Sequence, residues 1–200
     1  TLDNLVPVSI QNKFIERLKN ENFSWFYFND IIYGQDNKEF VNPNITKTFA
    51  FVHTLFDENG INSNDYDLFS TILNFFVVKE KVKIKDMIRV RIRRTFRIKN
   101  HSIEKYNVPH IDVKDHLPYK TLLYYVDNSD GDTVFFKNKL TKDMYLDTEA
   151  EEYKRISPKK GRAIYFDGDI YHSGNCPVDY NERTIINFDF KIWKILLINI

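Results

Sequence analysis

The chain has 200 residues, of which 42% are hydrophobic and 28% charged, and its formal net charge is +1. This composition suits one globular domain with a sizeable core, and the balanced charge argues against nucleic acid or an anionic membrane as the main partner. The single cysteine, Cys176, excludes an internal disulfide framework and favours a reducing compartment such as the cytoplasm. We find no apolar run of membrane-spanning length and no signal-peptide pattern.

The sequence lacks repeats, low-complexity tracts and an obvious linker, so we predict a single domain over residues 1–200. Its texture changes near Met87. Residues 1–86 are typical of a mixed, mainly helical support region, and residues 87–200 are typical of many short strands joined by turns. This order predicts a mainly β fold, a sandwich or barrel, with flanking helices.

Two helices are expected in the support region. Ser9 is predicted to cap the first one, whose apolar stripe repeats every fourth residue: Ile10, Phe14 and Leu18. The second follows a turn at residues 57–60 and begins between residues 63 and 65, with a predicted buried face made by Leu68, Ile72 and Phe76. Residues 22–33 are predicted to be extended, and residues 48–56 fit either a strand or a helix.

Residues 87–97 alternate apolar side chains with arginines, which indicates a half-buried strand. The basic cluster on this strand consists of Arg89, Arg91, Arg93, Arg94 and Arg97. We interpret it as a solvated strand face, because aromatic residues hardly interleave with it as they would in a nucleic-acid site. Further strands are expected over residues 120–126, 133–136, 162–166, 170–173 and 183–192. The Asp-rich stretch 127–132 is predicted to be a hairpin-type turn.

His110 and Asp112 are the strongest candidates for chemistry. Residues two apart on a strand point to the same side, so the pair would present an imidazole and a carboxylate together. His172 lies sixty-two residues later and can reach the same metal only if the two strands are neighbours. Two histidines and one carboxylate on one face of an octahedron leave positions open, as in non-haem Fe(II) oxygenases. Those positions would take 2-oxoglutarate and then O2.

Arg183, eleven residues after His172, supplies the planar guanidinium that can bind a dicarboxylate through two parallel hydrogen bonds. Tyr125 shares a predicted strand face with Thr121 and Leu123, and its hydroxyl could bond the same carboxylate. We therefore treat these four residues as candidates for binding the co-substrate. The alternative for Tyr125 is a core tyrosine whose hydroxyl is satisfied within the protein.

Several short motifs follow one another along the chain in an order that is typical of a known enzyme family. They are Pro109-His110-Ile111-Asp112, Leu123-Tyr124-Tyr125-Val126, Gly131-Asp132-Thr133-Val134-Phe135-Phe136, Pro158-Lys159-Lys160-Gly161-Arg162-Ala163, His172-Ser173-Gly174, Pro177-Val178 and Arg183. In order and spacing this set resembles the 2-oxoglutarate- and Fe(II)-dependent oxygenases, in particular their prolyl-hydroxylase-like branch. The N-terminal half shows a looser resemblance to small oxygenases of marine phages, for which the location would be the host cytoplasm.

The resemblance implies a double-stranded β-helix (jelly roll) buttressed by the N-terminal helices. It implies that His110, Asp112 and His172 hold iron, and that Arg183 binds the far carboxylate of 2-oxoglutarate with help from Tyr125. The implied reaction hydroxylates an unactivated C–H bond of a peptidyl residue or a small molecule, coupled to decarboxylation of 2-oxoglutarate to succinate and CO2. The chain departs from the common family pattern at Asn107, where many members carry a tyrosine that here lies one position earlier, as Tyr106. It departs again at Asp132, which replaces the second glycine of a common Gly-Gly pair.

Two other functions stay open: a zinc-dependent hydrolase on the same His-Asp-His residues, and a catalytically silent β-helix binding module. Nucleic acid is disfavoured as a substrate. Nucleic-acid demethylases of the superfamily resemble one another in carrying a second arginine six residues after the first, and here that position is Asp189. His116 is interpreted as substrate-side or exposed, and His53 and His101 as structural or exposed. The apolar C-terminal residues 192–200 are predicted to dock on the core or to form a homodimer contact.

Overall fold

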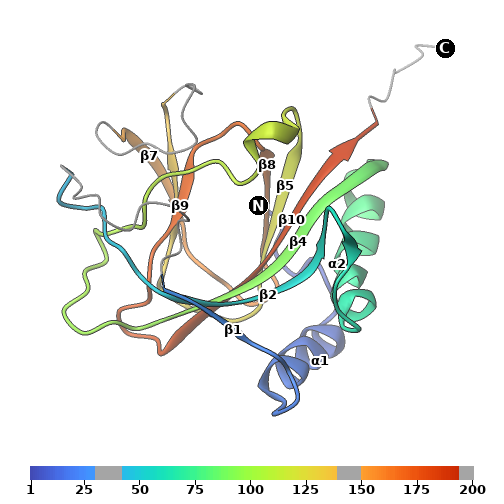
Figure 1. Cartoon of the computed structure of the whole chain (residues 1–200), viewed down its shortest axis with the longest axis horizontal. Helices are drawn as coiled ribbons and strands as arrows, with labels where there is room; N and C mark the ends of the chain where they lie inside the picture. Colours follow the sequence, from blue (N-terminus) through green and yellow to red (C-terminus); the bar gives the residue numbers. More distant parts are fainter. Residues whose placement is uncertain (30–41, 139–149, 194–200) are drawn as a thin grey trace.

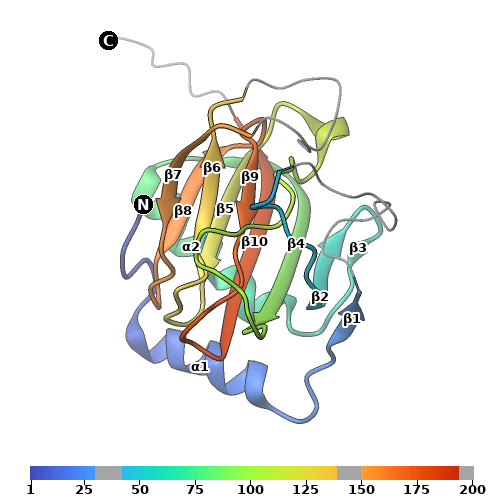
Figure 2. The same cartoon turned by 90° about the vertical axis from the view of Figure 1, so that its left-hand side faces the viewer.

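The computed structural model describes residues 1–29, 42–138 and 150–193. In this part of the chain, the strands form two antiparallel sheets that face one another (Figure 1). Two helices cover the outer face of the larger sheet, and the smaller sheet lies on its other side (Figure 2). The chain is therefore mainly β, with the flanking helices and paired sheets of the jelly roll that the sequence predicts.

The larger sheet has the strand order β1-β2-β4-β10-β5-β8, and β3 pairs with β2 outside this path. Its strands are β1 (Phe26–Phe28), β2 (Ala50–Asp57), β3 (Gly60–Ile61), β4 (Ile84–Phe96), β5 (Lys120–Tyr125), β8 (Ala163–Asp167) and β10 (Glu182–Ile192). The ambiguous stretch near residue 50 is thus a strand, because it pairs with β4. Strands from the N-terminal part of the chain consequently extend the same sheet that carries β4 and β10.

The smaller sheet has the order β7-β6-β9 and consists of β6 (Thr133–Phe136), β7 (Glu152–Ile156) and β9 (His172–Gly174). Strand β7 is not among the strands predicted from the sequence. The expected hairpin at residues 127–132 is wrong, because β5 and β6 belong to different sheets. This segment crosses from the larger sheet to the smaller one, and its Asp130 carboxylate accepts the backbone N–H groups of Val178 and Asp179 at 3.2 and 2.8 Å.

Helix α1 (Val8–Lys19) begins directly after Pro7, so Ser9 lies inside its first turn and does not cap it. Phe14 and Leu18 are buried as predicted, whereas Ile10 is only partly buried. Helix α2 (Tyr66–Glu80) starts after Asp65 and buries Phe69, Ile72, Leu73 and Phe76. Leu68 lies beside this buried face rather than on it, because the helix turns Phe69 toward the sheet.

Phe14 joins both helices to the larger sheet. Its fully buried ring lies 5.3 Å from the ring of Phe69 in α2 and 6.0 Å, edge-on, from that of Tyr124 in β5. Phe14→Ala is expected to lower the free energy of unfolding by about 3–5 kcal/mol, because it removes apolar contacts and leaves a cavity. Urea denaturation measures this loss.

Val8→Ala is the control, because Val8 belongs to the same helix and is 63% exposed. It should change the free energy of unfolding by less than about 0.5 kcal/mol. Equal losses in the two variants would contradict the packing described for Phe14.

The inner face of the larger sheet is set by the register of β4, β10 and β5. Residues directly opposite one another share a face, which gives three rows across the sheet: Arg93–Ile185–Tyr125, Arg91–Asn187–Leu123 and Arg89–Asp189–Thr121. Leu122, Tyr124, Ile186 and Phe188 alternate with these residues and pack under the helices. The space between the two sheets is filled at one end by a second apolar cluster that includes Leu123, Tyr125, Phe135 and Ile164.

Within the described ranges, no helix combines the length and the apolar character needed to cross a membrane. The C-terminal stretch that was predicted to dock or dimerise lies outside the described residues from position 194 onward. Residues 30–41 and 139–149 likewise lie outside the described residues.

Candidate functional site

His110 and His172 form an isolated antiparallel β-bridge, although they are sixty-two residues apart in the sequence. Each backbone N–H donates to the other residue's carbonyl, at 2.9 and 3.1 Å. The neighbouring strands that the His-x-Asp pattern required are therefore present as a single bridge. The segment around His110 is not a continuous strand, and Asp112 lies just beyond the bridge in a bend.

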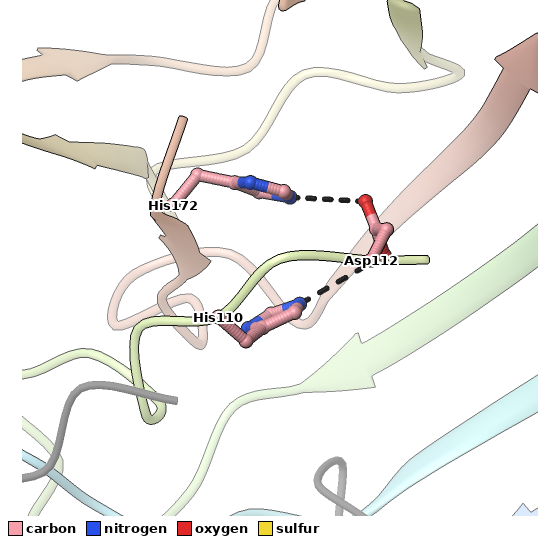
Figure 3. A group of neighbouring side chains, drawn as sticks. All are labelled: His110, Asp112 and His172. Atoms are coloured by element: carbon pink, nitrogen blue, oxygen red, sulfur yellow. Dashed lines mark ion pairs between the residues drawn. The ribbon is translucent and has the colours of Figure 1, made fainter. Parts of the chain in front are cut away.

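The three candidate ligands converge (Figure 3). The Asp112 carboxylate lies 3.2 Å from Nε2 of His172 and 3.9 Å from Nε2 of His110, and all three side chains are buried. One ligand atom from each residue falls within 4.8 Å of the others. This is the only such group of metal-ligating side chains in the part of the chain that the structure describes.

Both imidazoles are held so that Nε2 faces the cluster. Nδ1 of His110 lies 2.9 Å from the carbonyl oxygen of Val108, and Nδ1 of His172 lies 3.1 Å from that of Ile170. A carbonyl can only accept, so Nδ1 of each ring donates to it, and Nε2 is the ring nitrogen left to face the other candidate ligands. Burial, assisted by the nearby His172, lowers the pKa of His110 to about 4, so this ring is neutral at physiological pH.

Asp112 is fixed from both sides by the inner face of the larger sheet. Arg89 Nη2 donates to its Oδ1 at 2.6 Å, and Asn187 Nδ2 donates to its Oδ2 at 2.8 Å. Burial disfavours the charged carboxylate, but the Arg89 guanidinium together with His172 and His110 outweighs it and holds the pKa of Asp112 well below its usual range. The carboxylate is thus ionised and oriented before any ligand arrives.

The donor set fits a divalent metal ion. Nε2 of both imidazoles and the Asp112 carboxylate point at one another inside the protein. Such a group is favourable when a cation sits among the three atoms. Two histidines and one carboxylate are also the ligands of mononuclear Fe(II) sites that keep positions open for substrates.

A buried arginine shares the cavity with this cluster. Arg183 is 2% exposed, and its Nη2 donates to Thr133 Oγ1 at 2.8 Å, while its Nε has no partner. Among the described residues, no carboxylate pairs with it. Two glycines make room for the side chain, since a Cβ at Gly131 would lie 2.9 Å from its Cδ and one at Gly174 would lie 3.3 Å from its Nη1.

The other predicted co-substrate residues take different places. Leu123 lines the cavity together with Arg183, but Tyr125 and Thr121 do not. The Tyr125 hydroxyl lies 2.6 Å from Thr133 Oγ1, and its ring centroid lies 5.7 Å from the Arg183 guanidinium. Thr121 donates to the Asp189 carboxylate at 2.8 Å. Tyr125 therefore contacts Arg183 directly with its ring and indirectly through Thr133, a cavity residue that was not among the predicted site residues.

The arginines of β4 were misjudged from the sequence. Arg89, Arg91 and Arg93 do not form a solvated outer face but line the same cavity as the His-Asp-His cluster. Their alternation with apolar residues was read correctly, but both faces of β4 are covered. The helices cover one face, and the smaller sheet and the segment around His110 cover the other.

The remaining candidates stay outside the site. His116 is exposed on the short helix η1 (Lys114–His116), consistent with its interpretation as an exposed residue. His53 is buried between the Ser24 carbonyl and the Ser63 hydroxyl, and His101 bonds Asn175, so both are structural. Cys176 is buried and unpaired.

Neither a protein-family model nor a curated protein matches the sequence. Solved structures do match. One is an oxidoreductase of the 2OG-Fe(II) oxygenase family from Burkholderia pseudomallei, with a TM-score of 0.62, 12% identity, and coverage of 96% of this chain and 83% of that one. A Pseudomonas putida prolyl-4-hydroxylase matches with a TM-score of 0.54, 12% identity, and coverage of 95% and 90%.

A third match is HygX from Streptomyces hygroscopicus, solved with nickel and 2-oxoglutarate. Its TM-score is 0.58 at 9% identity, with coverage of 95% of this chain and 81% of that one. Identities this low show likeness of fold. The chain thus has the fold of the 2-oxoglutarate- and Fe(II)-dependent oxygenases, prolyl hydroxylases among them, and it carries a His-Asp-His cluster inside that fold.

Proposed function

We propose that the protein is an Fe(II)- and 2-oxoglutarate-dependent dioxygenase that hydroxylates an unactivated C–H bond of a peptidyl residue or a small molecule. The observation that carries the proposal is a single cavity that holds both the two-histidine, one-carboxylate cluster and a buried arginine without a carboxylate partner among the described residues. A metal ion would bind to the His-Asp-His cluster, and a carboxylate of a dicarboxylate co-substrate would pair with the arginine.

His110, Asp112 and His172 would hold the iron. When bound, the metal supplies O2 activation coupled to decarboxylation of 2-oxoglutarate to succinate and CO2. Arg183 would bind the far carboxylate of 2-oxoglutarate through its guanidinium, which Thr133 holds in place at 2.8 Å. Because this arginine is buried, its ionic hydrogen bonds are weakly screened by solvent and orient the co-substrate firmly.

The surrounding residues prepare the site. Arg89 and Asn187 hold the two oxygens of Asp112. Leu123 and Ile185 give the cavity an apolar wall near Arg183, which excludes water from part of the space where the co-substrate would lie. The protein's task in such chemistry is to position the reactants and to keep unproductive turnover low.

The zinc hydrolase has less support. A metal hydrolase needs a general base beside the metal-bound water, yet the cavity lining contains no glutamate and no carboxylate other than Asp112. Asp189, the nearest other acid on the inner face, is bonded to Arg89 and Thr121. A silent binding module would have no need for two histidines and a carboxylate that converge beside a buried arginine with no carboxylate partner among the described residues.

The test is anaerobic addition of Fe(II) and then 2-oxoglutarate, monitored by the visible metal-to-ligand charge-transfer band. A band should form in the wild type, and Arg183→Ala should weaken 2-oxoglutarate binding by about 100-fold, since it removes a buried ionic pair of hydrogen bonds. Arg97→Ala is the matched control, because Arg97 is exposed just past the end of β4. A wild type that forms no band but binds Zn2+ tightly would overturn the proposal in favour of the hydrolase or the silent module.

A further inference from the structure

The arginines that line the cavity carry more positive charge than the acidic residues beside them offset. Four guanidinium groups line it: those of Arg89, Arg91, Arg93 and Arg183. Arg89 is matched by two acids, since its Nη2 lies 2.6 Å from Asp112 Oδ1 and 2.8 Å from Asp189 Oδ2. The other three have no carboxylate partner among the described residues.

The proposed iron and co-substrate do not remove this excess. Fe(II) carries two positive charges and 2-oxoglutarate carries two negative ones, so together they leave the balance of the cavity unchanged. Arg183 is accounted for by the far carboxylate of 2-oxoglutarate. Asp112 and Asp189 offset two of the four arginines, so two positive charges remain, and they belong to the pair that no acid contacts: Arg91 and Arg93.

Arg91 and Arg93 are built into the wall of the cavity. They are alternate residues of β4, opposite Asn187 and Ile185 of β10, and so point to the same side as Arg89. Both are half-buried, and Arg91 Nε has no hydrogen-bond partner. Burial and the neighbouring Arg89 lower the pKa of Arg91 to about 10, and burial lowers the pKa of Arg93 to about 10, so both are still charged at neutral pH.

A structural role does not account for the pair. Half-buried cations without an acid partner destabilise a fold through desolvation and mutual repulsion, and within the described ranges neither guanidinium makes an ion pair that offsets that cost. Their place is next to the metal ligands, in the same cavity as His110 and Asp112. A ligand group that is negatively charged and enters the cavity beside the iron would satisfy them.

We propose that Arg91 and Arg93 form an anion subsite for the primary substrate, which therefore carries a carboxylate or a phosphate group. The inference rests on the proposed dioxygenase function and specifies its substrate class. Binding the acid group on β4 would leave the rest of the substrate directed along the inner face toward the metal ligands. Two guanidinium groups recognise an oxyanion by charge-assisted hydrogen bonds, which are among the strongest available in proteins.

The experiment uses protein saturated with Fe(II) and 2-oxoglutarate under anaerobic conditions, so that Arg183 is occupied. Sodium sulfate is titrated by calorimetry against sodium chloride of equal ionic strength. Wild type should bind sulfate saturably, and Arg91→Gln and Arg93→Gln should each weaken it by about tenfold or more, the effect of one lost ionic hydrogen bond. Arg97→Gln, which removes an exposed arginine at the end of the same strand, should leave sulfate affinity unchanged.

Acetate and methyl phosphate, titrated in the same way, separate the two kinds of acid group, because the better fit should bind more tightly. Folding is checked by thermal denaturation without anions. Arg91→Gln and Arg93→Gln should melt no lower than the wild type, since each removes an unpaired charge. Arg91→Lys and Arg93→Lys keep the charge, so their sulfate affinity is measured as a second test.

Sulfate affinity that is unchanged in Arg91→Gln and Arg93→Gln, or sulfate that binds only when 2-oxoglutarate is withheld, overturns the anion subsite. The charge-transfer band is recorded on the same samples. Its absence from the wild type overturns the proposed dioxygenase, whereas its presence together with unchanged sulfate affinity overturns the subsite alone.

Discussion

His172→Ala is expected to lower the affinity for Fe(II) by more than about 100-fold, because even residues that only support a metal ligand cost 10–100-fold when removed. His172 contributes one of the three converging donors, and its bridge to His110 ties β9 to the segment that carries Asp112. The backbone hydrogen bonds of that bridge survive the substitution, so the loss should fall on the metal and not on the fold. Anaerobic calorimetry with Fe(II) measures the affinity, and succinate release measures turnover, which should vanish.

His116→Ala is the matched control for this prediction. His116 lies six residues after His110, but it is exposed on η1 and is not part of the cluster. Its removal should change neither Fe(II) affinity nor the melting temperature. If His116→Ala lost iron while His172→Ala kept it, the ligand set described here would be wrong.

The members of the His-Asp-His cluster could be predicted from their chemical type and from the spacing of His110 and Asp112. His110 and Asp112 are two residues apart, and His172 adds a second histidine further along the chain. The side chains that could bind a metal were therefore identifiable from the sequence. The way they meet was less predictable. They come together through one β-bridge and a bend, a geometry that depends on how two sheets face each other and not on the periodicity of one segment.

The inner face of β4 shows where periodicity stops being informative. Alternation between Val90 or Ile92 and the arginines indicates a strand with two different faces. It does not say whether the polar face meets water or a cavity, because that depends on what the fold places above it. Here the smaller sheet and the His110 segment cover it, so Arg91 and Arg93 face the cavity.

The pairing of β5 with β10 determines which residues lie beside one another on the inner face of the larger sheet. Thr121, Leu123 and Tyr125 do share the inner face of β5, as the alternation predicts. Only the register with β10 shows that Asn187 sits opposite Leu123 and that Asp189 sits opposite Thr121. Register between strands distant in the sequence depends on the whole sheet, so Asn187, which holds Asp112, was not identified although it lies four residues after Arg183.

Arg89→Gln is expected to lower the free energy of unfolding by about 3–5 kcal/mol, because it leaves buried carboxylates without their shared cation. Arg89 is the only guanidinium that contacts both Asp112 and Asp189 in the part of the chain that the structure describes. Urea denaturation of the metal-free protein measures the loss, with Arg97→Gln as the exposed control. We also expect Fe(II) affinity to fall by about 10–100-fold, since Asp112 loses a residue that orients it.

The pH dependence of this loss identifies its cause. Burial raises the pKa of Asp189 to about 6 even with Arg89 present, and removing the arginine should raise it further. A carboxyl whose pKa is higher in the folded than in the unfolded state binds a proton on folding, so stability rises as the pH falls toward the unfolded value. The loss in Arg89→Gln should therefore be larger at pH 8 than at pH 5. A loss of equal size at both values would mean that Arg89 stabilises the fold through packing of its side chain and not through the charge of Asp189.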